Sequence, residues 1–218
     1  MDTEDSRTEL AQQACQERAV LEELVEQLAS TSRIRRQKTA SVIALVADED
    51  ASVLVPYIEQ LGEGLMHPEA QTRWELLHVL NALGALGQTF DDEVIGAAQD
   101  ALYDESNGIV REAAFRFFCS YGAASPAHSD EVWLYIDEAI QCYHGNGEFT
   151  DMLTCLVEFA QGDISMETST ALASRMRFDA ENGSGTLRMR AGQIMEAFKA
   201  HGGSYDMLSA PARPGENA

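Results

Sequence analysis

The residues with the clearest capacity for chemistry are a few thiols and imidazoles. Cys142 and His144 lie close together, and Cys155 begins a following helical segment. Thiol and imidazole groups are zinc ligands, but a zinc site takes four protein ligands, or three and a water molecule. With no fourth ligand evident nearby, we expect no metal site. We interpret all four cysteines, including Cys15 and Cys119, as reduced and mostly buried thiols.

The sequence contains none of the well-marked catalytic or phosphate-binding motifs. It has no Gly-x-Ser-x-Gly elbow, no Gly-x-x-x-x-Gly-Lys loop, no His-Glu-x-x-His pair and no Gly-x-Gly-x-x-Gly after a strand. The five histidines are scattered along the chain. We therefore expect a protein that is not an enzyme and that carries no cofactor.

The charge of the chain is strongly negative and unevenly distributed. Its 218 residues include 36 Asp and Glu against 15 Lys and Arg, for a formal net charge of -21. Residues 48–170 hold 23 acids and 3 bases, whereas residues 1–47 hold 8 and 6. This balance disfavours nucleic acid and anionic membranes as partners. The acidic middle is either an ordinary solvated surface or a surface that attracts a basic partner.

The elements that must position any site are helices. Apolar residues three, four and seven apart predict a first helix over about residues 5–29. Clusters of Gly, Pro, Asn, Asp and Ser then recur at short intervals and divide the chain into ten amphipathic segments of about 12 to 20 residues. Residues 1–4 and 203–218 are expected to be a disordered end and a flexible tail. No apolar run reaches membrane length and the first residues are acidic, so we expect a cytoplasmic protein.

The helical segments pair into a repeat. Aligned starts of the second helix of each pair place four arginines in register, with Thr150 in the remaining position and spacings of 37, 38, 39 and 40 residues. These arginines are Arg36, Arg73, Arg111 and Arg190. The position seven residues after each anchor is always apolar, as packing against a neighbouring helix requires: Ile43, Leu80, Phe118, Val157 and Ala197.

This pattern resembles the HEAT repeat, whose second helix begins with Asp, then Val-Arg, then small apolar residues. Val110-Arg111, followed by Ala114 and Phe118, gives the closest match, and the resemblance covers residues 5–202. It implies an all-α fold, an α-α superhelix or right-handed solenoid of about five helical hairpins and about ten helices in a single domain. Armadillo repeats share much of the pattern, and a compact helical bundle is the alternative.

The resemblance also assigns a structural role to the four arginines. In HEAT repeats the equivalent side chain reaches acids in the turn of an adjacent repeat, which stabilises the stack. The candidate acids in this chain are Asp48, Asp50, Asp104 and Glu105.

Paired-helix solenoids commonly bind partners along the concave side, which the second helix of each pair lines. Positions one and five after each anchor should face outward there. The positions are Gln37, Ser41, Trp74, His78, Glu112, Arg116, Asp151, Cys155, Ala191 and Met195. The candidate binding residues among or near them are Trp74, His78, Glu112, Arg116, Asp151 and Glu158. Trp74 is either an interface anchor or a side chain that lies partly in the groove between repeats.

The sequence thus favours a non-catalytic scaffold or adaptor that binds a protein or peptide, which the charge predicts to be basic. Some proteins of similar architecture are enzymes, including bilin lyases and DNA glycosylases. A glycosylase needs a cationic concave face, so the lyase is the stronger enzymatic alternative. A purely structural subunit is the third possibility. The sequence does not indicate the oligomeric state.

Overall fold

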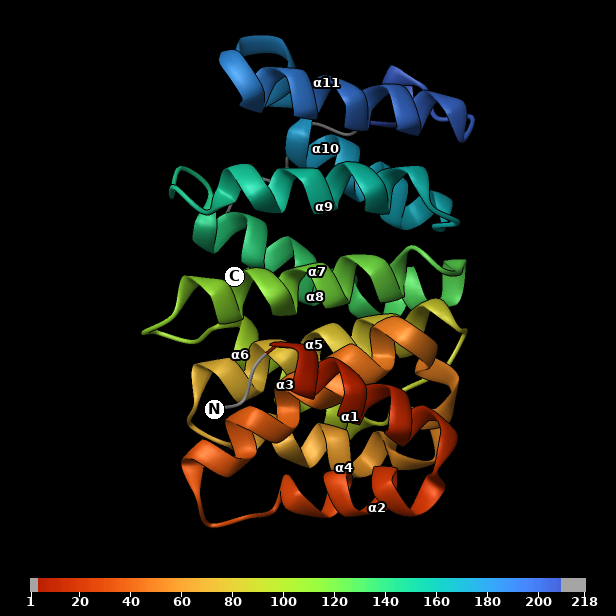
Figure 1. The fold of residues 1–218 in the computed structure, drawn as a ribbon. Coiled ribbons are helices and arrows are strands. Elements are labelled where there is room, and N and C mark those ends of the chain that lie inside the picture. The colour runs from red at the N-terminus through yellow and green to blue at the C-terminus, as the bar shows by residue number, and fades with distance from the viewer. Residues whose placement is uncertain (1–3, 209–218) are drawn as a thin grey trace. The chain divides into compact units, whose positions relative to one another are not determined.

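A computed structural model describes residues 4–208, and every regular element in that range is a helix (Figure 1). Two compact units divide the described chain, residues 4–117 and residues 118–208, and the division falls inside one helix. The prediction of an all-α fold is confirmed. No helix among residues 4–208 is both long and apolar enough to cross a bilayer.

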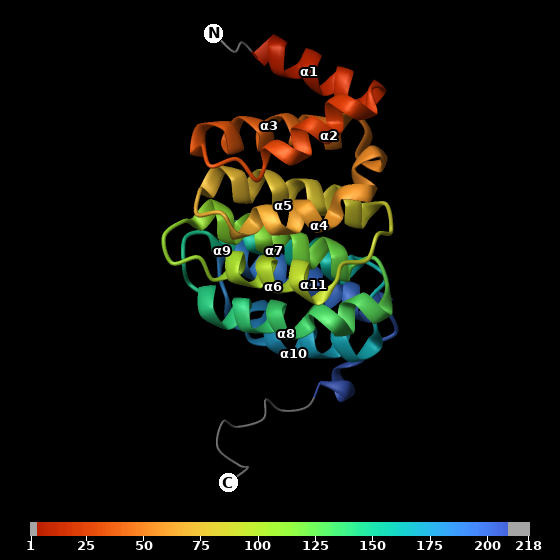
Figure 2. The same ribbon diagram turned by 90° about the horizontal axis from the view of Figure 1, so that it is seen from below.

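Unit 1 is a set of stacked helical hairpins. Its elements are α1 (Glu4–Gln16), α2 (Arg18–Gln27), α3 (Arg33–Asp50), η1 (Ala51–Tyr57), α4 (Ile58–Glu63), η2 (Gly64–Met66), α5 (Ala70–Ala85), α6 (Asp92–Leu102) and the first part of α7 (Gly108–Gly122). The second helix α3 packs on the second helix α5, and the first helix α4 packs on α6, as Figure 2 shows. This alternation is what a hairpin repeat requires, because each helix covers its counterpart in the next hairpin.

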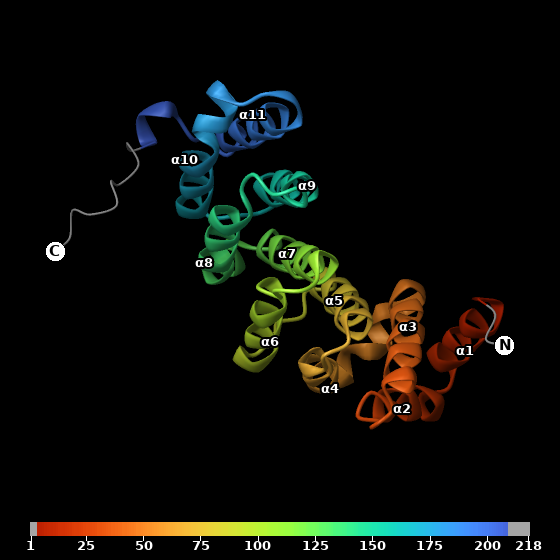
Figure 3. The ribbon, with the colours of Figure 1, turned by 90° about the vertical axis from the view of Figure 1, so that its left-hand side faces the viewer.

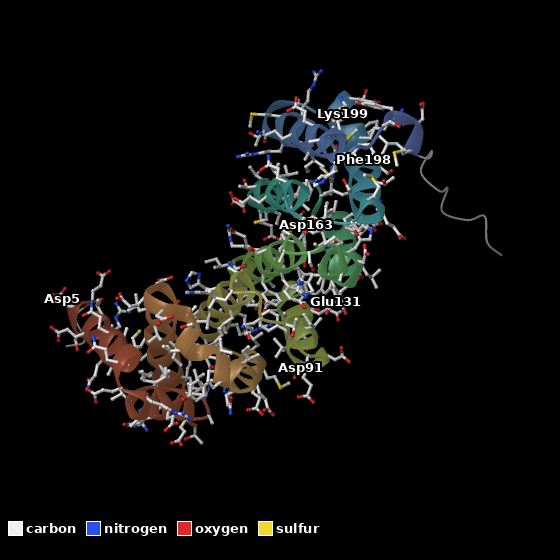
Figure 4. The ribbon with its side chains drawn as sticks, turned by 90° about the vertical axis from the view of Figure 1, so that its right-hand side faces the viewer. Asp5, Asp91, Glu131, Asp163, Phe198 and Lys199 are labelled. Atoms are coloured by element: carbon white, nitrogen blue, oxygen red, sulfur yellow. The ribbon has the colours of Figure 1, made fainter. Side chains whose placement is uncertain are left out.

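Unit 2 repeats the same arrangement. After the end of α7, it contains α8 (Pro126–Tyr143), α9 (Phe149–Gln161), α10 (Met166–Asn182), α11 (Gly185–Ala200) and η3 (Tyr205–Met207). Here α8 packs on α10 and α9 packs on α11 (Figure 3). One face of α11 belongs to the core and another meets solvent. Phe198 is buried and Lys199 is exposed (Figure 4).

The predicted first helix over residues 5–29 is wrong in one respect, because it is broken at Glu17. Glu17 has extended backbone angles, φ -118° and ψ 99°, and α2 begins at the next residue. Both α1 and α2 pack against α3. A straight helix of 25 residues would be about 37 Å long, longer than the 18-residue α3 that covers it, and the break lets both halves contact that helix.

Residues 51–66, predicted as one of the ten amphipathic helices, also depart from a regular α-helix. Residues 51–66 form two 3₁₀ stretches, η1 and η2, on either side of the short α4. Pro56 lies inside η1 and has no backbone N–H to donate, which disfavours a continuous α-helix at this point.

The residues that break the amphipathic pattern end and cap the helices as the sequence predicts. Asp91 accepts a hydrogen bond from the Val94 N–H (2.9 Å) at the start of α6, and Ser165 accepts one from the Thr168 N–H (3.0 Å) at the start of α10. Such caps satisfy donors that the first helical turn leaves unpaired. Gly87, which follows α5, has a φ of 77°, a region that other residues rarely adopt.

The core follows the repeat register. All five apolar residues that lie seven positions after the anchors are buried: Ile43, Leu80, Phe118, Val157 and Ala197. The hydrophobic positions of the repeat are therefore confirmed.

The expected flexible tail over residues 203–218 needs correction in its first part. Residues 205–207 form η3, and Leu208 is 5% exposed and packs against Ala173, Met195 and Phe198. Leu208 thus anchors this segment on the core of unit 2, while Tyr205 and Met207 stay exposed. Residues 209–218, like residues 1–3, lie outside the described range.

We predict that Leu208→Ala lowers the free energy of unfolding by about 2 kcal/mol, because it removes buried methyl groups from this cluster. The measurement is urea unfolding followed by circular dichroism. The control is Met207→Ala, whose side chain is 42% exposed and which should have little effect. Equal unfolding midpoints for the Leu208→Ala variant and the wild type would show that the segment does not contribute to the core.

Candidate functional site

A shallow groove in unit 1 collects four of the six candidate binding residues. It lies between α5 and the start of α7, which run side by side in Figure 3, and has a volume of about 200 Å³. From α5 it is lined by Trp74, Leu77, His78 and Asn81, and from α7 by Ile109, Glu112, Ala113 and Arg116. In both sets the later residues lie three, four and seven positions after the first, which places four side chains on one helix face. We call this the α5/α7 groove.

The groove offers an aromatic surface beside charged groups of both signs. Trp74 is partly exposed, while His78 and Arg116 are exposed. The Nε2 atom of His78 lies 2.7 Å from Oδ1 of Asp48, which belongs to α3, and Arg116 donates to Glu112 over 3.2 Å on α7. These charged contacts are largely solvent-accessible, so water weakens them and a ligand can exchange with them.

Asn81 was not singled out from the sequence. Its Oδ1 atom is buried and has no hydrogen-bond partner within the described residues, although the side chain lines the groove. A buried acceptor without a donor costs free energy, so it favours a ligand that supplies an N–H. The signal that could have found it is its spacing, because it lies seven residues after Trp74 on the same face of α5.

The other two candidates belong to unit 2. Asp151 and Glu158 are both exposed, and they lie seven residues apart on α9 and therefore on one face of that helix. The structure thus brings Trp74, His78 and Glu112 together with Arg116 in unit 1, and it places the two carboxylates separately on α9.

Four positions expected to face outward are buried instead: Ser41, Cys155, Ala191 and Met195. Ser41 donates to Oε1 of Glu75 (2.8 Å) and accepts from Gln71 (3.0 Å), so it lies in the contact between α3 and α5. Met195 is covered because Leu208 packs against it. The rule of one and five after the anchor therefore holds for the groove between α5 and α7 but not along the whole chain.

The four aligned arginines occupy different environments. Arg36 forms a buried ion pair with Glu69 and donates to the carbonyl of Ser30 (2.6 Å), and Arg73 forms an ion pair with Asp104. Glu69 and Asp104 both belong to the segment that precedes the second helix of the next hairpin.

Arg111 donates to the backbone carbonyl of Asp104, so two of the four arginines meet at this residue. Arg190 donates to Gln193 (3.1 Å) within α11, and its Nε has no partner in the described part of the chain.

Only one of the four acids expected to bind the arginines does so in these contacts. Asp104 binds Arg73, but Asp48 contacts His78, and Asp50 accepts from the Ser52 N–H (3.0 Å) as the cap of η1. Glu105 is exposed. The acid that binds Arg36 is Glu69, which immediately precedes α5 and which the sequence reading missed.

Hydrogen bonds and ion pairs hold the pKa values of both carboxylates below their ordinary values. The hydrogen bond from Arg36 lowers the pKa of Glu69, and this outweighs the opposing effect of burial. Burial by itself would raise the pKa of Asp104, but the N–H and hydroxyl of Ser106 together with Arg73 hold it below its ordinary value.

The side chains of Cys142, His144 and Cys155 do not form a common site. Cys142 is exposed, Cys155 is buried, and His144 lies 3.0 Å from Oδ2 of Asp179. No group of three or more His, Cys, Asp and Glu side chains among residues 4–208 is placed to hold a metal ion.

No protein-family model and no curated protein sequence matches the chain. Solved structures do. A designed armadillo repeat protein in complex with the peptide (KR)4 superposes with a TM-score of 0.68 at 14% identity, over 89% of this chain and 92% of that one. A computationally designed armadillo repeat protein for modular peptide recognition gives 0.63 at 15% identity over 89% and 92%. An engineered protein gives 0.61 at 16% identity over 90% of both chains.

These likenesses, together with the stacked hairpins, show the class of the protein. It has an all-α helical repeat fold of the armadillo/HEAT type, and the predicted solenoid class is confirmed. At this level of identity the comparisons carry the fold alone.

We predict that Arg36→Ala lowers the free energy of unfolding by about 2 to 3 kcal/mol, because it leaves the carboxylate of Glu69, with a side chain 4% exposed, without its partner. Urea unfolding at neutral pH measures the change. The control is Arg18→Ala. Arg18 pairs with Glu22 on the surface of α2, with side chains 80% and 46% exposed, and its removal should change little. Equal losses in the two variants would contradict the structural role of Arg36.

The same ion pair predicts a dependence of stability on pH. Because the pKa of Glu69 is lowered in the folded protein, its contribution is fully present above the ordinary value of 4.5 and is lost as the pH falls through the lowered folded value. We expect the stability of the wild type to fall more steeply below pH 4.5 than that of Arg36→Ala. Parallel curves of unfolding free energy against pH would show that Arg36 does not set the pKa.

Proposed function

We propose that this protein is a non-catalytic scaffold that binds a basic peptide or an exposed basic segment of a protein in the α5/α7 groove. The observation that carries the proposal is the groove itself, where a partly exposed Trp74 lies beside Glu112 and the unpaired Oδ1 of Asn81. The groove lies on the second helices of two hairpins, the surface that such solenoids offer to partners.

Each group in the groove suits one part of an extended basic segment. The indole of Trp74 can contact the aliphatic part of a Lys or Arg side chain and attract its charge. Glu112, with Asp48 beside His78, can pair with that charge. The Oδ1 atom of Asn81 can accept a hydrogen bond from a backbone N–H, which makes the ligand's main chain part of recognition.

Two further observations support a basic partner. Residues 48–170 hold 23 acids against 3 bases, so the field of this part of the chain attracts cations. A designed armadillo repeat protein of similar fold is complexed with the basic peptide (KR)4. We extend the proposal to Asp151 and Glu158, which would supply carboxylates from α9. It also places the protein in the cytoplasm, where an exposed free thiol such as Cys142 remains reduced.

The test uses the eight-residue Lys-Arg repeat as a fluorescent probe, because its chemistry matches the proposed partner. We expect fluorescence anisotropy to detect binding at about 50 mM salt and strong weakening at about 500 mM, where the Debye length falls to a few ångströms. A Gly-Ser peptide of equal length should not bind. Equal binding of both peptides, or binding that salt does not change, would contradict the charge-based proposal.

The site is tested by the double variant Trp74→Ala with Glu112→Arg. We expect it to abolish binding of the Lys-Arg peptide while the free energy of unfolding stays within about 1 kcal/mol of the wild type, because both side chains are at least partly exposed. The matched control is Asp100→Arg, which reverses an exposed charge on α6 outside the groove and should preserve most of the affinity. Unchanged affinity in the double variant would place the peptide elsewhere.

A further inference from the structure

A second groove lies in the N-terminal part of unit 1, and all of its lining residues precede the acidic residues 48–170. It is formed by α1, the end of α2 and the start of α3, and it has a volume of about 430 Å³. Leu10, Leu24 and Val42 supply an apolar lining, while Arg7, Arg35 and Lys38 supply cations. None of these residues lines the α5/α7 groove. We call this second site the α1/α3 groove.

Two cations of this groove have no acidic partner among the described residues. Arg36, Arg73 and Arg175 each pair with a carboxylate. Arg7 and Arg35 form no ion pair with any acid within residues 4–208, although the chain carries 36 acids. Since acids are in excess by more than two to one, cations that converge on an apolar groove without internal partners point to an anion from outside.

The start of α3 adds to the positive potential. Ser32 caps this 18-residue helix and lines the groove, and its Oγ accepts from the Arg35 N–H over 3.5 Å. The first turn of a long helix carries a partial positive charge from its unpaired N–H groups. An anionic head group beside Ser32 would therefore meet both this dipole and the guanidinium of Arg35.

The N-terminal part of the chain is far less acidic than the middle part. Residues 1–47 contain 8 acids and 6 bases, in contrast to the strongly acidic residues 48–170. At physiological ionic strength charges act over about 8 Å, so the local balance decides the potential in the groove.

We propose that the α1/α3 groove binds a small amphiphilic anion, with a carboxylate or phosphate head at Arg7, Arg35 and the start of α3. Its alkyl body lies over Leu10, Leu24 and Val42. The volume lies within the range of small-molecule sites, about 300 to 1,000 Å³, and three helices form the walls. A groove of this size, with cations at one part and an apolar lining at another, suits one amphiphile molecule with an anionic head. The site is independent of peptide binding in the α5/α7 groove.

The probe is octanoate, titrated below its micelle concentration and followed by calorimetry. We expect octanoate to bind with 1:1 stoichiometry. Acetate, which has the head alone, and octylammonium, which has the opposite charge, should bind at least about tenfold more weakly. The Ile34→Ser variant, which removes an apolar side chain 67% exposed at the rim, should reduce the difference between octanoate and acetate.

Arg7→Gln and Arg35→Gln each remove one positive charge from the groove, and each should weaken octanoate binding about tenfold. The matched control is Arg33→Gln, which removes an equal charge from the same turn of α3 but from a side chain that does not line the groove. All three variants should keep the circular dichroism spectrum and the affinity for the Lys-Arg peptide, which separates this proposal from the proposed function.

Four results would overturn the proposal. Equal affinity for acetate and octanoate would show an ion site only, and equal affinity for octylammonium would show that charge plays no part. Binding to phosphatidylserine vesicles without binding of free octanoate would assign the groove to a membrane surface. Binding of an acidic Glu-Leu peptide without octanoate would assign it to a protein partner.

Discussion

The constraint on which the structure depends is that no helical hairpin of this chain can bury its apolar faces alone. Within unit 1, α3 is covered by α5 and α4 by α6, and within unit 2, α9 is covered by α11 and α8 by α10. Stacking also brings the polar ends of hairpins together, where charges must be satisfied. The pairs of Arg36 with Glu69 and of Arg73 with Asp104 do this, and they leave the faces of α5 and α7 around Trp74 available to a ligand.

Much of the fold is readable from the sequence because packing repeats with the register. The apolar position seven residues after each anchor predicts the buried faces of α3 and α5, and clusters of small and polar residues predict the helix ends. The break at Glu17 has no such signal, because the sequence on both sides is compatible with a helix and only the length of α3 requires the bend. Leu208 is similar. It lies after the last repeat, so no periodicity marks it, and its burial depends on contacts with Ala173, Met195 and Phe198 that only the folded unit brings together.

The candidate site was predictable in part for the same reason. Helical spacing places Trp74 with His78 on one face, and the repeat places Glu112 and Arg116 at equivalent positions of the next hairpin. The spacing rule fails where a neighbouring helix covers the position, as α5 covers Ser41 on α3. The sequence does not reveal the partner of Arg36, because the ion pair depends on proximity in the folded protein and Glu69 is more than 30 residues away along the chain. The unpaired Oδ1 of Asn81 cannot be inferred from residue type at all, since most buried amides find a partner.

The most direct test of the central claim is a crystal structure of the protein with the eight-residue Lys-Arg peptide. The account predicts extended peptide density in the α5/α7 groove, with a basic side chain over the indole of Trp74 and a backbone N–H of the peptide donating to Oδ1 of Asn81. Peptide bound on the first helices α4 and α6, with this groove empty, would contradict it.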